Sequence, residues 1–393
     1  MTLIPNQRHL FDIPANVAYL NTATMGPLPL AALEAGQRGL ARKLHPWTIQ
    51  DTDFFADTAR LRPLLARLIG ADDEGIALVP SASYGLATAA LNLPLSRGQE
   101  ILILEDQFPS NVYTWREHAA FTGASLRTVK AGGNGSLSDA LLEAIGPATG
   151  IVACPHVRWT DGARIDLASV SRKCREHGAA LVLDLTQSAG ALSFDADDIQ
   201  PDFMVAAGYK WLLGPYATGF LYVAPKHRQG RPLEQNWITR DNAGNFARLI
   251  DYTDGYAPGA ERFDMGERSN FALLPALEDA VKLILHWGVG NIEETLGHRN
   301  RQLATDLAAM GLSSLPESER GPHYLSALLP ASAPADLTAR LKSENIHVSR
   351  RGDRLRICRG FQPSRQPIAP ASPSRSARCT IPARRGRAAR QSG

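Results

Sequence analysis

Short apolar runs alternate with longer polar segments from residue 75 to residue 225 of this 393-residue sequence. Several runs are apolar throughout, as expected of strands that helices cover on both faces. The alternation therefore predicts an α/β fold with a mostly parallel central sheet covered by helices, although short apolar runs also occur in buried helices. The expected strands are GIALVP (75–80), EILILED (100–106), GIVACPHV (150–157), AALVLDL (179–185), DFMVAA (202–207) and GFLYVAP (219–225).

Helical patterns fill the intervals between these runs and continue beyond them. LASVSRKCREHG (167–178) predicts a helix that ends at a glycine, and residues 271–310 read as helical throughout. The short connection between the last two expected strands allows an antiparallel pair there. A helix near 335–344, between candidate strands at 323–330 and 345–357, predicts a smaller α+β region.

These patterns divide the chain into four expected parts. We expect an N-terminal segment (1–15), a large domain around the predicted sheet (16–260), a small C-terminal α+β domain (261–357) and an irregular tail (358–393).

Several classes of protein are disfavoured by composition. We find no apolar run of about 18 residues, no signal-peptide pattern at the start and no metal-binding spacing of the four cysteines, so we expect a cytoplasmic protein without membrane or metal. The net charge is +3, but subtracting the eight arginines of residues 359–393 leaves −5 for residues 1–358. We therefore do not expect a nucleic-acid partner.

Chemically useful residues follow the expected strands. In open α/β sheets ligands bind at the carboxyl ends of the strands, so these residues are expected to share one rim. Ser81 and Ser83 open a helix whose first N–H groups form a natural phosphate site, and Asp184 and Lys210 follow two other strands.

This combination points to pyridoxal phosphate (PLP). PLP needs a lysine for a Schiff base, an acid beside its pyridine nitrogen, a phosphate cup and a flat group against its ring. Burial would lower the pKa of Lys210 and make its amine a usable nucleophile. We therefore interpret the lysine between two apolar strands as the cofactor's covalent anchor.

The stretch VLDLTQSAG…PDFMVAAGYKWLLGPYATGFLYV resembles the class V aminotransferase family of fold-type I PLP enzymes. This family includes cysteine desulfurases, kynureninases and isopenicillin N epimerase-like proteins. The resemblance runs from about residue 19 to residue 357, and its most specific feature is D-x-x-Q followed by a lysine 26 positions after the aspartate.

The resemblance implies roles for individual residues. Lys210 matches the Schiff-base lysine, Asp184 the acid at the pyridine nitrogen, and Gln187 the residue that hydrogen-bonds the ring hydroxyl. Ser83, with the backbone of Ala82 and Tyr84, matches the phosphate loop.

The resemblance also implies roles for two aromatic residues and one arginine. Tyr209 matches a tyrosine that contacts the phosphate in kynureninases, and Phe108 lies where other members stack a ring on the cofactor. Arg356 matches the arginine that pairs with the substrate carboxylate, for which its fork is suited.

Structural readings of the same residues stay open at this point. Phe108 and Tyr209 could be packing residues, Ser83 a helix cap, Asp184 a cap or turn, and Arg356 a surface strand residue. Asn21 and Thr22 lie in a segment that often lines the substrate site in the family. Trp159 replaces a common asparagine and could wall the substrate pocket or belong to the core.

The sequence departs from the family pattern at two places. Desulfurases carry a nucleophilic cysteine ahead of the substrate arginine, whereas Cys358 follows Arg356, so persulfide chemistry is not expected there. Glu267 stands where relatives have a threonine that reaches the partner subunit's phosphate. Arg268, Ser269 or Asn270 are the candidates to replace that threonine.

The tail after Ile357 changes character. Residues 358–393 contain eight arginines and five prolines but no leucine, valine or acidic residue. Such a composition does not form the amphipathic helix with which relatives end. We interpret it as the product of a frameshift, with a natural disordered basic tail as the alternative.

The leading functional prediction is a class V aminotransferase-like enzyme that acts on an amino acid through a Lys210 Schiff base, with lyase or epimerase chemistry as alternatives. A catalytically impaired homologue, limited by the altered C-terminus, is the other class that the sequence leaves open. The resemblance also implies a homodimer.

Overall fold

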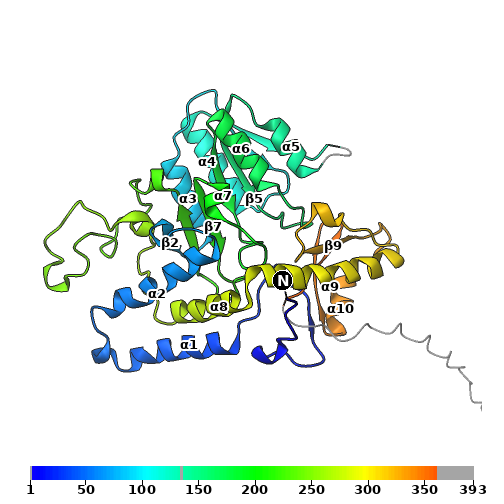
Figure 1. Cartoon of the computed structure of the whole chain (residues 1–393), viewed down its shortest axis with the longest axis horizontal. Helices are drawn as coiled ribbons and strands as arrows, with labels where there is room; N and C mark the ends of the chain where they lie inside the picture. Colours follow the sequence, from blue (N-terminus) through cyan, green and yellow to red (C-terminus); the bar gives the residue numbers. More distant parts are fainter. Residues whose placement is uncertain (1, 133–135, 361–393) are drawn as a thin grey trace, which may run out of the picture. The chain divides into compact units, whose positions relative to one another are not determined.

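The structure is a computed structural model and describes residues 2–132 and 136–360, all within one compact unit, Met1–Pro363. Figure 1 shows its central sheet among helices, with a smaller sheet near the C-terminal end. The tail beyond residue 360, and with it the frameshift hypothesis, lies outside the described residues. No helix in the described ranges is long and apolar enough to cross a membrane.

Seven strands form the central sheet in the order β2-β8-β7-β6-β5-β3-β4. All neighbours are parallel except β8, which runs antiparallel to both β7 and β2, as the short connection around Lys210 allowed. The predicted α/β class is confirmed. The strands are β2 (Ile76–Val79), β3 (Glu100–Leu104), β4 (Ser125–Val129), β5 (Thr149–Pro155), β6 (Ala180–Asp184), β7 (Phe203–Ala207) and β8 (Gly219–Val223).

Six of these strands were expected from sequence, and β4 was not. The residues of β7 and β8 are buried throughout, which explains their unbroken apolar sequences. The edge strand β4 reads SLRTV and is largely exposed, so it lacks the apolar signal on which the prediction relied.

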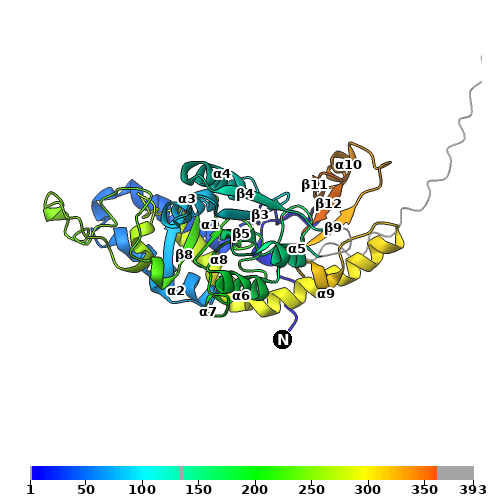
Figure 2. The same cartoon turned by 90° about the horizontal axis from the view of Figure 1, so that it is seen from above.

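Helices cover both faces of the central sheet (Figure 2). One face packs on α3 and α4 through a core that includes Leu86 and Trp115. The other face packs on α2, α5, α6 and α8 through a larger core. The helices are α1 (Leu30–Ala41), α2 (Asp53–Leu68), α3 (Ala82–Asn92), α4 (Ser110–Thr122), α5 (Leu137–Ala144), α6 (Leu167–His177), α7 (Ala196–Ile199), α8 (Leu273–Trp287), α9 (Val289–Ala309) and α10 (Leu337–Ser343).

The long helical region predicted at 271–310 is two helices. Gly288 separates α8 from α9 with φ of 78°, a left-handed value that glycine adopts without strain. Gly178 ends α6 in the same way, as its sequence predicted.

A second, antiparallel sheet of order β11-β12-β9 follows α9, and a short parallel pair joins β1 to β10. Leu325, Ala327, Leu355 and Ile357 on one face of this sheet pack with Leu307 of α9. The expected α+β region is therefore present, while the domain boundary at residue 260 stays a prediction. The strands are β1 (Ala18–Tyr19), β9 (Leu325–Leu328), β10 (Ile346–His347), β11 (Ser349–Arg351) and β12 (Arg354–Ile357).

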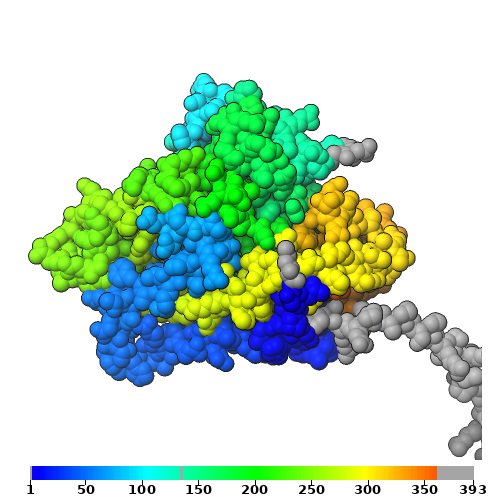
Figure 3. Space-filling model, viewed as in Figure 1, coloured from blue at the N-terminus to red at the C-terminus, as the bar shows by residue number. Residues whose placement is uncertain are grey.

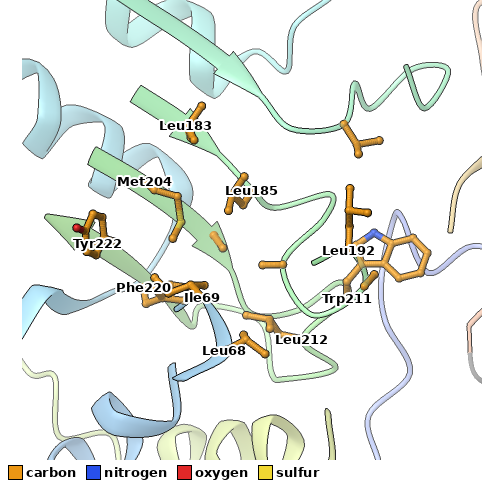
Figure 4. Close-up of a cluster of buried hydrophobic side chains, with 14 of the residues drawn as sticks. Leu68, Ile69, Leu183, Leu185, Leu192, Met204, Trp211, Leu212, Phe220 and Tyr222 are labelled. Atoms are coloured by element: carbon orange, nitrogen blue, oxygen red, sulfur yellow. The ribbon is translucent and has the colours of Figure 1, made fainter. Parts of the chain in front are cut away.

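The segment after Lys210 is anchored in the larger core. Trp211 and Leu212 are buried and lie close to Leu192, beyond the ends of the central strands (Figure 4). On the other side, the Gly26 N–H donates to the carbonyl of Tyr209 over 2.8 Å. Apolar packing and this backbone contact together fix the position of the lysine.

We predict that Gly26→Ala destabilises the protein and displaces Lys210. An added Cβ would lie 2.0 Å from the Lys210 carbonyl oxygen, so the backbone must shift. Overpacking of this kind lowers the free energy of unfolding by roughly 1–3 kcal/mol. Urea denaturation measures the loss.

Gly146→Ala is the matched control, because an added Cβ at Gly146 meets no heavy atom within 4 Å. Equal unfolding free energies for the two variants would contradict the close approach at Gly26.

Candidate active site

The loop between β7 and β8 holds Lys210 in a strained turn. The Gly208 N–H donates to Thr218 O over 2.7 Å, and the Gly214 N–H donates to Gly208 O over 2.9 Å. Leu213 and Ala217 have φ of 56° and 63°, values that residues with side chains rarely adopt. Strain of this kind persists where the surrounding structure enforces it, often at functional sites.

The Lys210 side chain is buried, with 6% of its surface exposed. Its Nζ lies 5.2 Å from the centroid of the Phe108 ring and 5.5 Å from that of Tyr209. Burial lowers the pKa of Lys210 to about 8, with the charges of Arg356 and Arg351 acting in the same direction and Asp184 opposing them. A much larger fraction of this amine is therefore unprotonated near neutral pH than of an ordinary lysine.

Asp184 ends β6 and is also buried. Burial raises the pKa of its carboxyl, while hydrogen bonding to Thr186 and the nearby Lys210 charge lower it. The Thr186 N–H donates to Asp184 Oδ1 over 2.9 Å and fixes the carboxylate at the strand end. The structure thus places a buried acid and a buried amine at the ends of neighbouring strands.

The N-terminus of α3 supplies donors on another side. Ser81 caps the helix by accepting from the Tyr84 N–H over 3.2 Å, and its hydroxyl lies 2.9 Å from that of Ser83. The N–H groups of Ala82 and Ser83 precede the hydrogen-bonding ladder of the helix and are oriented for an anion.

These elements enclose one cavity of about 270 Å³. Of the predicted site residues, Ala82, Ser83, Phe108, Trp159, Asp184, Gln187, Tyr209 and Lys210 line it. The other lining residues are Pro80, Ser81, Gln107, Ser110, Asn111, Pro155, Val157, Thr186, Ala207, Tyr216 and Ala217.

Gln187 is held by three neighbours. Its Oε1 accepts from Trp211 Nε1 over 3.1 Å, and its Nε2 donates to Ala23 O over 3.0 Å. His323 Nε2 lies 2.6 Å from Gln187 O, and burial lowers the pKa of His323 to about 4, so the ring is neutral and donates from Nε2. The second Nε2 hydrogen of Gln187 is left for a group in the cavity.

Trp159 is a wall of the cavity rather than a residue of the deep core. It is half-buried, its ring meets Phe108 edge-on with centroids 5.5 Å apart, and its Nε1 donates to Asp106 O over 2.7 Å. Its carbonyl oxygen accepts from Arg356 Nη1 over 3.0 Å and from the hydroxyl of Tyr324.

Arg356 lies behind this wall and does not line the cavity itself. It is 1% exposed, so the surface reading of this residue is wrong. It donates further to Ser349 Oγ over 3.0 Å, to Tyr324 OH over 3.2 Å and to Thr24 Oγ1.

Two predicted residues are peripheral to the cavity. The ring of Tyr84 packs with the core between the sheet and α3, so only its backbone faces the helix N-terminus. Asn21 does not line the cavity but accepts from Thr24 Oγ1 over 2.8 Å, and Thr24 contacts Arg356. Asn21 therefore acts on the site through Thr24.

Several site residues were not singled out from sequence. Tyr216 follows the Gly-Pro after Lys210, and its ring lies 4.6 Å from that of Tyr209, so the motif itself was a usable signal. Tyr324 is fully buried against Arg356 but lies in a plain apolar strand pattern, which carries no signal.

The three residues predicted to contact the phosphate of a partner subunit form their contacts within this chain. Arg268 is buried and pairs with Glu261 and Asp264, and Ser269 donates to Phe54 O. Asn270 Oδ1 accepts from the N–H of Leu273, the first residue of α8, over 2.9 Å.

The cysteines of the described ranges are all buried thiols. Burial raises the pKa of Cys174 and of Cys358 to about 12 and also raises that of Cys154. A protonated, buried thiol is a poor nucleophile, so Cys358 is not suited to persulfide chemistry.

Comparison with known proteins identifies the family. A family model described as "Aminotransferase class-V" matches residues 40–368. The chain belongs to this family. Class V aminotransferases use pyridoxal phosphate, and the predicted family membership is confirmed.

Two relatives show how far the sequence similarity extends. Isopenicillin N epimerase of Streptomyces clavuligerus is 28% identical over 300 residues, which are 73% of this chain and 75% of the relative. Kynureninase of Deinococcus radiodurans is 28% identical over 304 residues, which are 74% of this chain and 71% of the relative. These values support the family but not one activity within it.

Solved structures share the fold. A variant of C-DES with glycine covalently linked to its PLP cofactor superimposes with a TM-score of 0.81 at 22% identity, covering 91% of this chain and 95% of that one. Cysteine desulfurase of Thermococcus onnurineus gives a TM-score of 0.77 at 21% identity, covering 91% and 94%. The predicted fold-type I architecture is confirmed.

We predict that Lys210 in the cofactor-free protein reacts with fluorodinitrobenzene with a midpoint near pH 8. Only the unprotonated amine reacts, and a lowered pKa makes it available at lower pH than the ordinary value of about 10.4 for lysine. Mass spectrometry of the Lys210 peptide across pH measures the midpoint. Arg356→Gln should raise it, since that charge lowers the pKa of Lys210.

A short lysine peptide provides the reference for the same reagent. A Lys210 midpoint that coincides with that of the peptide would contradict the effect of burial.

Proposed function

We propose that this chain is a PLP-dependent enzyme that acts on an amino acid, with Lys210 Nζ holding the cofactor covalently. The observation that carries the proposal is the meeting of Lys210, with its lowered pKa, and buried Asp184 in one cavity with the N-terminus of α3.

The residues around the cavity fit the parts of PLP. The α3 amides with Ser81 and Ser83 suit the phosphate, Asp184 the pyridine nitrogen, Gln187 Nε2 the ring hydroxyl and Phe108 the flat ring. When bound, PLP withdraws electrons from the substrate's α-carbon and makes its proton acidic.

Lys210 would then serve as the proton carrier. Its pKa of about 8 allows the Nζ to accept a proton from the substrate and return one near neutral pH. Asp184, buried and anchored by the Thr186 N–H, would hold its negative charge beside the ring nitrogen. The aromatic walls of Phe108 and Trp159 would exclude water from the reacting atoms.

Arg356 is proposed to bind the substrate carboxylate, which requires that the Trp159 wall in front of it moves when the substrate enters. Its side chain is fixed by Ser349, Trp159, Tyr324 and Thr24, and within the described part of the chain it forms no ion pair. A preorganised guanidinium without an acidic partner is suited to a carboxylate ligand.

We propose aminotransferase-like chemistry as the leading reaction, with a lyase or an epimerase as alternatives on the same residues. The carbon to which the proton returns separates transamination from epimerisation, whereas a lyase is distinguished by the loss of a β or γ group from the substrate. The buried, protonated Cys358 disfavours a mechanism in which that thiol attacks the substrate. Catalytic impairment by the altered C-terminus is a further alternative, and a cytoplasmic location stays a prediction.

We predict that the purified protein with PLP absorbs in the visible range and that borohydride fixes the cofactor on Lys210. Lys210→Ala should lose the covalent attachment and lower turnover by more than a thousandfold, because both the anchor and the proton carrier are removed. Peptide mapping after reduction and an amino-acid screen that detects keto acid, elimination product and inverted amino acid are the measurements.

Asp184→Asn separates cofactor attachment from turnover. It should retain the covalent cofactor but lower turnover strongly. Cofactor on another lysine, or full turnover of Lys210→Ala, would overturn the proposal, whereas a fixed cofactor without turnover would favour the impaired homologue.

We also propose a homodimer. Large exposed side chains gather on the segment between α1 and α2 and on residues 233–252, and Phe54 at the start of α2 makes ring contacts with Trp237 and Phe246 of the second segment. Trp47, Ile250 and Tyr252 are 76%, 77% and 93% exposed. Figure 3 shows these two segments, in blue and lime, as neighbouring parts of the visible face. Exposed apolar groups of this size are typical of protein interfaces.

We predict that light scattering gives twice the 42.5 kDa of one chain. Trp47→Ser with Tyr252→Ser should weaken the dimer at least tenfold, because two large apolar side chains leave the interface. Phe121→Ser is the control, since Phe121 is 89% exposed on α4. A monomer at micromolar concentration, or equal weakening by the control, would contradict this surface.

A further inference from the structure

The C-terminal sheet has one apolar face and one basic face. Cross-strand partners lie on the same face, and the register pairs Ser349 with Arg356 and Arg351 with Arg354. Arg351, Arg354 and Arg356 therefore share a face with Ser349. Leu355 and Ile357 alternate with the arginines of β12 and pack on the opposite face.

Two of these arginines meet at Trp159. Arg356 donates to the carbonyl oxygen of Trp159 over 3.0 Å, and the Arg351 guanidinium carbon lies 5.4 Å from the centroid of its ring. Trp159 lines the cavity that contains Lys210. The basic face of the sheet thus contacts Trp159, which forms one wall of the active site.

Neither guanidinium has a negative partner in the part of the chain that the structure describes. Arg351 is half-buried and donates to Arg350 O over 2.8 Å, and the ion pairs of the described residues include neither Arg351 nor Arg356. Residues 359–393 contain no aspartate or glutamate, so no acidic side chain of the tail can pair with them.

The two charges act on the same reaction centre. Both lower the pKa of Lys210, and the charge of Arg356 together with burial lowers the pKa of Arg351. Like charges held close together and partly shielded from water are unfavourable unless an anion lies between them. If the substrate's α-carboxylate pairs with Arg356, the positive charge of Arg351 still has no negative partner.

We propose that Arg351 is a specificity-determining residue that binds a second negative group of the substrate. The substrate class is then an amino acid with an anionic side chain, whose α-carboxylate lies on Arg356 and whose distal carboxylate reaches Arg351. Neither arginine lines the cavity itself, so this placement requires that Trp159, which both contact, moves aside when the substrate enters. This inference rests on the proposed function, because it assigns the substrate of that same cavity.

The test uses the PLP-loaded protein and the change of its visible spectrum on adding an amino acid. L-glutamate is compared with L-glutamine, and L-aspartate with L-asparagine, since each pair differs in charge but hardly in shape. We expect half-saturation by the acidic member at a concentration at least tenfold lower, or about 1.4 kcal/mol in binding.

Arg351→Gln should abolish this preference by weakening the acidic member alone, and Arg351→Lys should restore part of it. Arg350→Gln is the matched control, because Arg350 precedes Arg351 on β11 but points to the opposite face. The control should keep the full preference.

Several outcomes would overturn the inference. Equal half-saturation for glutamate and glutamine in the unchanged protein does so, as does a preference that survives Arg351→Gln. If Arg351 only packs on Trp159, its replacement will weaken both members of each pair equally.

A calorimetric titration separates this inference from the proposed function. If no amino acid changes the spectrum, the proposed function fails, but glutarate and butyrate still probe the two arginines in the same protein. Glutarate should bind at least tenfold tighter than butyrate, and Arg351→Gln should remove that difference. Equal affinities would overturn the role of Arg351.

Discussion

The burial of the Lys210 ammonium is the constraint on which the rest of the site depends. A charge removed from water is strongly unfavourable, and a protein relieves that cost by shifting the pKa or by pairing the charge. Here burial and two arginines favour the neutral amine, while Asp184 favours the charged one, and the result is a pKa of about 8. The lysine is thereby held close to the point where it exchanges protons at neutral pH.

This balance requires that residues from distant parts of the chain be held rigidly. The parallel order of β5, β6 and β7 brings Trp159, Asp184 and Lys210 to the same edge of the sheet. The reversal at β8 returns the chain beside β7, so the lysine lies in a tight loop rather than at the end of a long crossover. Burial on both sides of this loop then fixes its carbonyl groups against Gly26.

Much of this arrangement could be predicted from sequence, for physical reasons that differ between residues. The continuous apolar strands and the spacing from Asp184 to Lys210 carry strong local signals, and they identified the sheet and the cavity. The exposed strand β4 and the buried Tyr324 carry none, because their roles depend on neighbours that only the fold supplies. Arg356 could be assigned a role by family resemblance, but its support by Thr24 and Trp159 could not, since both lie far from it in sequence.

The hydrogen bond between Arg356 and Thr24 has a consequence for biosynthesis. It joins residues 332 positions apart, and Asn21 also bridges to Cys358 in the same region. During translation the N-terminal part of the chain emerges from the ribosome first. Thr24 and the central sheet are therefore made well before their partner in β12, and this corner of the site is left open until translation passes residue 356. Until then, the growing chain lacks the arginine that lies behind Trp159 and bonds its carbonyl oxygen.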